Sequence, residues 1–202
     1  MAYRVKEIYY TLQGEGLHTG RPAILCRFSG CNLACKFCDT DFQGTDGPGG
    51  GIFKSPENLA TSVADMFPGP GAHPFLAFVV CTGGEPALQV DEALVSALHN
   101  HGFEVGIETN GTLPLAAGID WVCVSPKAGA ELVVRSGDEL KLVFPQEGAE
   151  PERFEHLNFK YFFLQPMSGP SLQLNTGKAL EYCLSHPRWR LSLQTHKLLG
   201  IR

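Results

Sequence analysis

The sequence lacks the long hydrophobic runs that membrane proteins need. Its 202 residues are 44% apolar, but no stretch approaches the roughly 18 to 20 consecutive apolar residues that span a bilayer. The N-terminal Met-Ala-Tyr-Arg-Val-Lys-Glu already carries charges and contains no apolar segment of a secretory signal. We therefore expect a cytoplasmic protein with no membrane partner.

Basic runs are also missing. The formal net charge is −5 and no run of lysine and arginine is longer than two residues, so the electrostatic signature of a nucleic-acid-binding protein is absent. There is no internal repeat and no long low-complexity tract. The glycine-rich residues 44–51 are predicted to form a mobile loop, and residues 68–74 a second loop. We expect one domain over residues 1–202, because a second full domain would be crowded at this length.

Short apolar runs predict the strands of the fold. The runs cover residues 23–28, 75–81, 104–107, 121–124, 140–144, 160–164 and 190–193. They lack clean alternation, which favours a parallel sheet covered on both faces. Capping and breaking residues predict helices from Ser55 to about Met66, from Asp91 to His101 and from Thr176 to His186. The remaining connections are short and full eight-fold barrels typically need about 250 residues, so we expect an α/β fold that is a partial β/α barrel with some helices shortened or missing.

Polar or glycine-bearing turns follow five of these runs. Parallel strands place their carboxyl ends on one face, which carries the active site in barrel enzymes. Five such turns together therefore predict a catalytic face. The turns are Thr82-Gly83-Gly84-Glu85-Pro86, Glu108-Thr109-Asn110-Gly111, Ser125-Pro126-Lys127, Gln165-Pro166-Met167-Ser168 and Gln194-Thr195-His196-Lys197.

Three of the seven cysteines lie within one short segment, at Cys31, Cys35 and Cys38. In a reducing compartment such clustering indicates metal ligation before disulfides. Three thiolates suit an iron–sulfur cluster with one iron left open, since four cysteines ordinarily hold a cubane. The alternative is a structural zinc ion with Asp39 or a distant histidine as fourth ligand. Only the cluster hypothesis also explains the polar turns. The remaining cysteines are predicted to be small buried side chains: Cys26, Cys81, Cys123 and Cys183.

The cysteine loop, with Phe37 before its last cysteine, and the Gly-Gly-Glu-Pro turn resemble the radical S-adenosylmethionine superfamily. The resemblance implies a [4Fe-4S] cluster on the three cysteines, with S-adenosyl-L-methionine on the open iron. One electron then releases a 5′-deoxyadenosyl radical. The implied cofactor-binding residues are Phe37, Gly83, Gly84, Glu85, Ser125, Pro126, Lys127, Gln165, Pro166, Met167 and Ser168.

Further motifs resemble the 7-carboxy-7-deazaguanine synthase family: Leu-Gln-Gly-Glu-Gly near the start, Cys-Asp-Thr after the cluster, Glu-Thr-Asn-Gly and the terminal Gln-Thr-His-Lys. That family converts 6-carboxy-5,6,7,8-tetrahydropterin into 7-carboxy-7-deazaguanine with loss of ammonia, on the route to queuosine and other deazapurines. The resemblance implies a homodimer, regeneration of S-adenosylmethionine, a flavodoxin- or ferredoxin-type external electron donor, and Mg²⁺ on Thr40. A single hydroxyl ligand suits Mg²⁺, which keeps waters and takes ligands from substrate.

The expected substrate-binding residues are Leu12, Gln13, Gly14, Glu15, Arg27, Thr82, His196 and Arg202. The Arg27 guanidinium can pair with a substrate carboxylate, and Glu108 and His196 are the predicted catalytic residues. Two other hypotheses remain open. A glycyl-radical activating enzyme shares the small size and the cysteine loop, and a zinc- or cluster-stabilised binding module would have no activity.

Overall fold

The computed structural model describes residues 2–68 and 77–201 of the chain. Within these ranges the strands form one nine-stranded sheet in the order β3-β1-β2-β4-β5-β6-β7-β8-β9. The seven strands from β2 and β4 through β9 run parallel, and β1 pairs antiparallel with both β2 and β3. The strands are β1 (Tyr3–Leu12), β2 (Pro22–Phe28), β3 (Gly51–Phe53), β4 (Ala77–Gly83), β5 (Phe103–Thr109), β6 (Trp121–Val124), β7 (Ser136–Phe144), β8 (Asn158–Pro166) and β9 (Trp189–Leu191).

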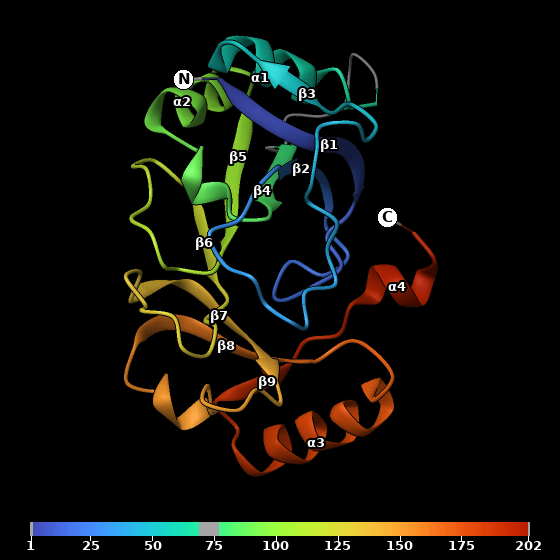
Figure 1. Ribbon diagram of the computed structural model, residues 1–202, viewed down its shortest axis with the longest axis vertical. Helices are drawn as coiled ribbons and strands as arrows, with labels where there is room; N and C mark the ends of the chain where they lie inside the picture. The colour runs from blue at the N-terminus through green and yellow to red at the C-terminus, as the bar shows by residue number, and fades with distance from the viewer. Residues whose placement is uncertain (1, 69–76, 202) are drawn as a thin grey trace.

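The sheet is a partial barrel with few helices, as predicted. It has two edges, β3 and β9, and is therefore not closed. The helices are α1 (Pro56–Ala64), α2 (Glu92–Asn100), α3 (Leu172–Ser185) and α4 (Thr195–Leu199). The described connections from β5 to β6 and from β6 to β7 contain no helix. The connection from β7 to β8 contains one 3-10 turn, Pro151–Arg153, and no α-helix. Figure 1 shows α1 and α2 at one end of the molecule and α3 at the other.

The helix starts follow local chemistry. The Ser55 hydroxyl accepts a hydrogen bond from the Asn58 amide, and the Asp91 carboxylate accepts one from the Leu94 amide, so both predicted caps are confirmed. Gly102 follows α2 in the left-handed region, with a φ of 81°, and stops that helix as expected. The third helix was predicted to begin at Thr176. This start is wrong, because α3 begins at Leu172. In the described part of the chain no helix is long and apolar enough to cross a membrane.

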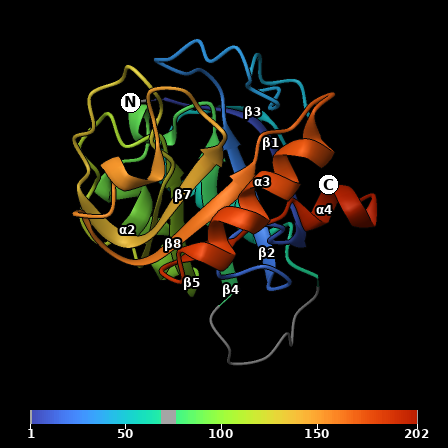
Figure 2. The same ribbon diagram turned by 90° about the horizontal axis from the view of Figure 1, so that it is seen from below.

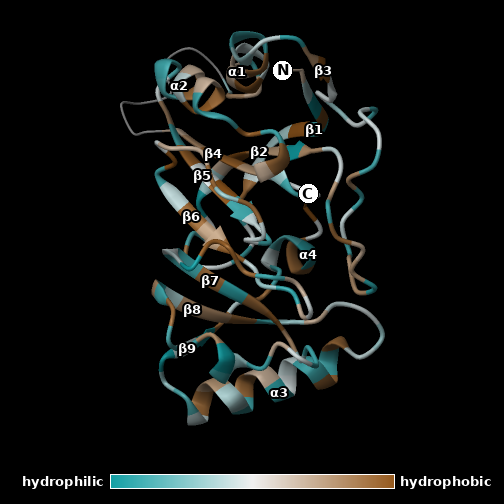
Figure 3. Cartoon of the chain, turned by 60° about the vertical axis from the view of Figure 1, so that its left-hand side comes forward, coloured by the Kyte–Doolittle hydropathy of each residue, from teal (hydrophilic) through white to brown (hydrophobic). Residues whose placement is uncertain are grey.

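Two apolar clusters hold the sheet to its helices. Leu59 and Val63 of α1 pack with Leu94 and Leu98 of α2 against the first strands. The second cluster places Ala179 of α3 against β7, β8 and β9. Figure 3 shows the hydrophobic colour along the central strands and alternating hydrophobic and hydrophilic bands on α3.

The strand predictions fail mainly at the edge of the sheet. All seven predicted strands form; the one at 121–124 has the predicted bounds, the others have shifted ends, and part of the run predicted from Phe75 lies outside the described residues. Strands β1 and β3 were not predicted: the edge strand β3 has only three residues, and β1 beside it mixes buried and exposed side chains instead of forming an apolar run. The expectation of a mobile loop at residues 44–51 is corrected: the Gly47 amide donates to the Lys6 carbonyl and Pro48 accepts from the Ile8 amide, which holds this segment against β1. The loop predicted at 68–74 lies, apart from residue 68, outside the described residues.

Candidate active site

A cavity of about 500 Å³ opens at the carboxyl ends of the parallel strands. Figure 2 shows the arrowheads of β7 and β8 directed toward the loop that carries the three clustered cysteines. This volume lies within the roughly 300–1,000 Å³ common for small-molecule sites. Of the residues predicted to bind cofactor, substrate or metal, those that line the cavity are Leu12, Gln13, Gly14, Glu15, Arg27, Cys31, Cys35, Phe37, Cys38, Thr40, Thr82, Gly83, Gly84, Glu108, Ser125, Lys127, Gln165, Pro166, Ser168 and His196.

The cysteine loop forms one wall. Cys31, Cys35 and Cys38 all line the cavity, and the Cys38 amide donates to the Cys35 carbonyl in a tight turn. Partial burial raises the pKa of the Cys31 thiol. The loop is anchored from the outside, because Asn32 accepts from the Asn110 amide group and donates to a threonine hydroxyl. Among the other cysteines Cys26, Cys81 and Cys123 are buried as predicted, whereas Cys183 is half-buried.

The glycine turn after β4 brings backbone close to this loop. Gly83 has a φ of 127°, and a Cβ at Gly84 would lie 1.9 Å from the Gly30 carbonyl oxygen. Only glycine fits there, so the backbone itself forms this part of the cavity wall. The Glu85 side chain does not line the cavity. Its buried carboxylate accepts from the Thr109 hydroxyl at 2.7 Å and from the Asn110 amide at 2.7 Å, which ties the turn to the end of β5.

The ends of β6 and β8 supply a second wall. The Lys127 ammonium donates to the Ser125 carbonyl at 2.6 Å and hydroxyl at 2.7 Å, and burial lowers the pKa of Lys127. Pro126 faces a separate cavity of about 250 Å³, and Met167 lines neither cavity. Glu85, Pro126 and Met167, which were predicted to bind the cofactor, are therefore not among the residues that line the 500 Å³ cavity.

A third group of residues carries the charge of the site. The Thr82 hydroxyl donates to Oε2 of Glu108 at 3.1 Å, and the Gln13 amide donates to Oε1 of Glu108 at 3.2 Å. The Arg27 guanidinium points to the same cavity but is held by Oε1 of Glu7, 2.9 Å from its Nε. A substrate carboxylate at Arg27 would therefore share this cation with Glu7.

The C-terminal segment covers the cavity from the side of α4. A Cβ at Gly14 would lie 2.1 Å from Nδ1 of His196, so the imidazole packs directly on that backbone. Burial lowers the pKa of His196, which favours the neutral ring. Gln194 donates to Oε1 of Glu15 at 2.9 Å. Arg202, predicted to bind substrate, lies outside the described residues.

The chain matches the family model of the radical SAM superfamily over residues 25–139. It is 58% identical to a protein of Bordetella pertussis and 56% identical to one of Bradyrhizobium diazoefficiens, over the whole of each chain, and both are named 7-carboxy-7-deazaguanine synthase. Among solved structures, QueE from Escherichia coli has a TM-score of 0.73 at 30% identity and covers 96% of this chain and 94% of that one. The chain belongs to the 7-carboxy-7-deazaguanine synthase family.

Membership of the 7-carboxy-7-deazaguanine synthase family confirms the predicted family and enzyme class, and the fold agrees with it. It does not favour a glycyl-radical activating enzyme or a non-enzymatic module. The radical SAM family implies a [4Fe-4S] cluster and S-adenosylmethionine. The donor set fits that cluster, since three thiols share one cavity wall. The family match does not favour a structural zinc ion at these cysteines.

Lys141 is the main site residue that the sequence analysis missed in this family member. It lines the cavity from β7, and its ammonium contacts both Glu15 and Glu108. The available signal was a single lysine inside an otherwise apolar run, Leu-Lys-Leu-Val, in a predicted buried strand. A buried lysine needs ionic partners, so this position called for carboxylates that only the fold could bring together.

Proposed function

We propose that this chain converts 6-carboxy-5,6,7,8-tetrahydropterin into 7-carboxy-7-deazaguanine and ammonia. The observation that carries the proposal is the single cavity that unites Cys31, Cys35 and Cys38 with polar side chains from the strand ends. Relatives that share more than half of the sequence are named for this product. Substrate atoms balance as product plus one ammonia, so the ring contraction needs no net oxidant.

In this proposal the three cysteines hold the cluster, and the backbone at Gly83 and Gly84 receives S-adenosylmethionine. When bound, these groups would supply the one-electron chemistry that removes the hydrogen atom at C6 of the substrate. The chain's own task is to orient the pterin and to move protons. Arg27 pairs with the substrate carboxylate, and Thr82 and Glu108 present a polar edge to the ring.

His196 is the proposed proton acceptor during aromatisation. Its pKa is lowered by burial, so the neutral imidazole is available near pH 7, and it lines the cavity beside Gly14. We further propose that Thr40, on the cavity wall next to the cysteine loop, gives one hydroxyl ligand to Mg²⁺. Mg²⁺ keeps several waters and takes ligands from substrate, so one protein hydroxyl suffices in this proposal.

The remaining parts of the proposal concern the whole molecule. We propose one domain over residues 1–202, a location in the cytoplasm, and reduction by a flavodoxin- or ferredoxin-type donor. We also propose a homodimer. Light scattering of the purified protein measures that oligomeric state directly.

Anaerobic turnover of reconstituted protein tests the reaction. The assay contains 6-carboxytetrahydropterin, S-adenosylmethionine, dithionite and Mg²⁺, and mass spectrometry follows the products. We expect 7-carboxy-7-deazaguanine while the S-adenosylmethionine pool stays intact. Formation of 5′-deoxyadenosine without the deazaguanine product would leave the radical chemistry standing and overturn the substrate assignment.

A further inference from the structure

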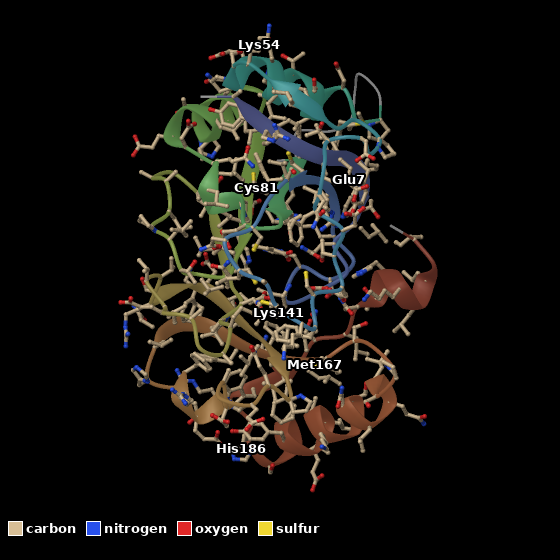
Figure 4. All side chains as sticks on the ribbon, viewed as in Figure 1. Glu7, Lys54, Cys81, Lys141, Met167 and His186 are labelled. Carbon is tan, nitrogen blue, oxygen red and sulfur yellow. The ribbon has the colours of Figure 1, made fainter. Side chains whose placement is uncertain are left out.

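Lys141 is a buried cation at the centre of the cavity. Only 6% of its side chain is exposed, and Figure 4 shows it near the middle of the molecule, between the two halves of the sheet. Its Nζ atom lies 2.5 Å from Oε2 of Glu15 and 3.1 Å from Oε1 of Glu108. Glu15 comes from the β1–β2 loop and Glu108 from the end of β5, so one ammonium joins carboxylates from two segments far apart in the sequence.

The outer oxygens of this pair are held by neutral donors. Gln194 donates to Oε1 of Glu15, and Thr82 donates to Oε2 of Glu108. Each carboxylate oxygen has two lone pairs, and for each of these two outer oxygens one contact is described. The cavity therefore presents acceptor capacity on both carboxylates, provided that both are ionised.

Lys141 is the group that allows both to be ionised. Two carboxylates close together in a buried site repel, so that one ordinarily keeps its proton. Burial alone would raise the pKa of Glu15, but Lys141 and Gln194 outweigh it and lower this pKa to about 2. Burial would likewise lower the pKa of Lys141, yet Glu108 and Glu15 raise it well above its usual value. The titratable groups that interact with this triad from the surrounding elements are Asp39, Cys123, Lys127, Glu139 and His196.

The backbone of the β1–β2 loop has anchors of its own. The Leu17 amide donates to Oε2 of Glu139, and the Gly16 amide donates to the Ser192 hydroxyl, both at 2.9 Å. Replacing the Lys141 ammonium would leave these bonds in place. The expected consequence is a change in the charge and spacing of the two carboxylates, with the loop backbone still attached to the sheet.

We propose that Lys141 is a positioning residue that holds Glu15 and Glu108 ionised and side by side, as paired acceptors for a substrate heterocycle that carries N–H donors. This inference rests on the proposed function for the identity of the substrate. It adds one requirement to that function: the cavity must hold two carboxylates whose negative charge is partly compensated by one lysine.

The test compares Lys141→Met and Lys141→Arg with the wild-type holoenzyme, at matched cluster content, between pH 6 and 9. Misplacement of a positioning group can cost on the order of 100-fold, so we expect Lys141→Met to lose about that factor in kcat/KM at pH 7.5. Lys141→Arg keeps the charge and should recover most of it. The matched control is Lys178→Met, which removes an exposed lysine from α3 and should behave as wild type.

The pH profile separates this role from a merely structural one. Without the ammonium one carboxyl must hold its proton to a higher pH, so Lys141→Met should lose further activity as the pH falls from 8 to 6, while wild type does not. If the activity of Lys141→Met per bound cluster varies with pH in parallel with that of wild type, the proposal is overturned. If Lys141→Met does not fold, Lys141→Met/Glu15→Gln and Lys141→Met/Glu108→Gln restore the charge balance. Recovery of folding and cluster content in either double variant supports the proposal, and failure of both contradicts it.

The folding readout does not depend on the substrate. Wild-type enzyme that makes no deazaguanine product would refute the proposed function. The charge rescue, measured by melting temperature and cluster content, would still decide the role of Lys141.

Discussion

The Nζ atom of Lys197 lies 2.6 Å from Oδ2 of Asp39, and this contact joins the C-terminal helix α4 to the residue that follows the last cysteine of the cavity loop. The same ammonium donates to the Ser168 hydroxyl at the end of β8, 3.1 Å away. Lys197 therefore links three segments around the mouth of the cavity.

Lys197→Met should weaken ligand binding with little loss of stability. Both partners of the ion pair are more than a third exposed, and such pairs contribute about 0–1 kcal/mol. Because α4 also positions His196, loosening it should raise KM for the pterin on the order of several-fold, with a smaller change in kcat. Steady-state kinetics and melting temperature measure the two effects. Lys178→Met, on the exposed side of α3, is the control, and an unchanged KM for Lys197→Met would contradict the role given to the contact.

Glu85→Ala should destabilise the fold. The buried carboxylate accepts hydrogen bonds from the Thr109 hydroxyl, the Asn110 amide and the Ala87 amide, and leaving such donors unsatisfied costs about 3 kcal/mol or more. Glu85→Gln should cost less, because its carbonyl oxygen can keep the bonds to Thr109 and Ala87. The melting temperature of the anaerobic protein reports the difference. A Glu85→Ala protein with the wild-type melting temperature but no affinity for S-adenosylmethionine would instead support a direct cofactor contact.

Gly84→Ala should be incompatible with the native turn. Its Cβ would lie 1.9 Å from the Gly30 carbonyl oxygen and 2.5 Å from the carbonyl carbon, and neither backbone atom can rotate away. Overpacking of this kind costs about 1–3 kcal/mol, and we expect the upper end. Gly177→Ala is the matched control, because it lies within α3 with nothing within 4 Å of the added methyl. It should stabilise the protein by about 0.5–1 kcal/mol, and equal melting temperatures for the two variants would refute the steric argument.

The sequence predicts this site where its chemistry is local. The cysteine spacing and the double glycine are contained in single segments, and both segments reach the cavity wall. Roles that depend on partners far along the chain were missed. The Lys141 partners Glu15 and Glu108 are 126 and 33 residues away, and no spacing rule connects them.

The same reasoning applies to Glu85 and to two elements that the sequence analysis did not predict. Glu85 follows two glycines that do reach the cavity, but its side chain turns to Thr109 and Asn110 because β5 ends beside it in the sheet. Strand β1 owes its place to pairing with β2, which its mixed polar pattern does not reveal. Helix α4 has five residues and no buried side chain, so no apolar periodicity marks it.

Thr40→Ala should change the magnesium response and leave the cluster intact. The threonine lines the cavity two residues after Cys38, close enough to the cysteine loop to serve a ligand there, yet it contributes no thiolate. Mg²⁺ keeps a near-octahedral shell and uses few protein ligands, so loss of one hydroxyl should raise the Mg²⁺ concentration for half-maximal activity several-fold without abolishing turnover. Activity is titrated with Mg²⁺ after removal of free metal by chelation, and iron content is measured on the same sample. Thr61→Ala, exposed on α1, controls for loss of a threonine elsewhere. A Thr40→Ala titration that superimposes on wild type would contradict the assignment of this ligand. Loss of iron would instead show that Thr40 stabilises the cysteine loop and does not bind Mg²⁺.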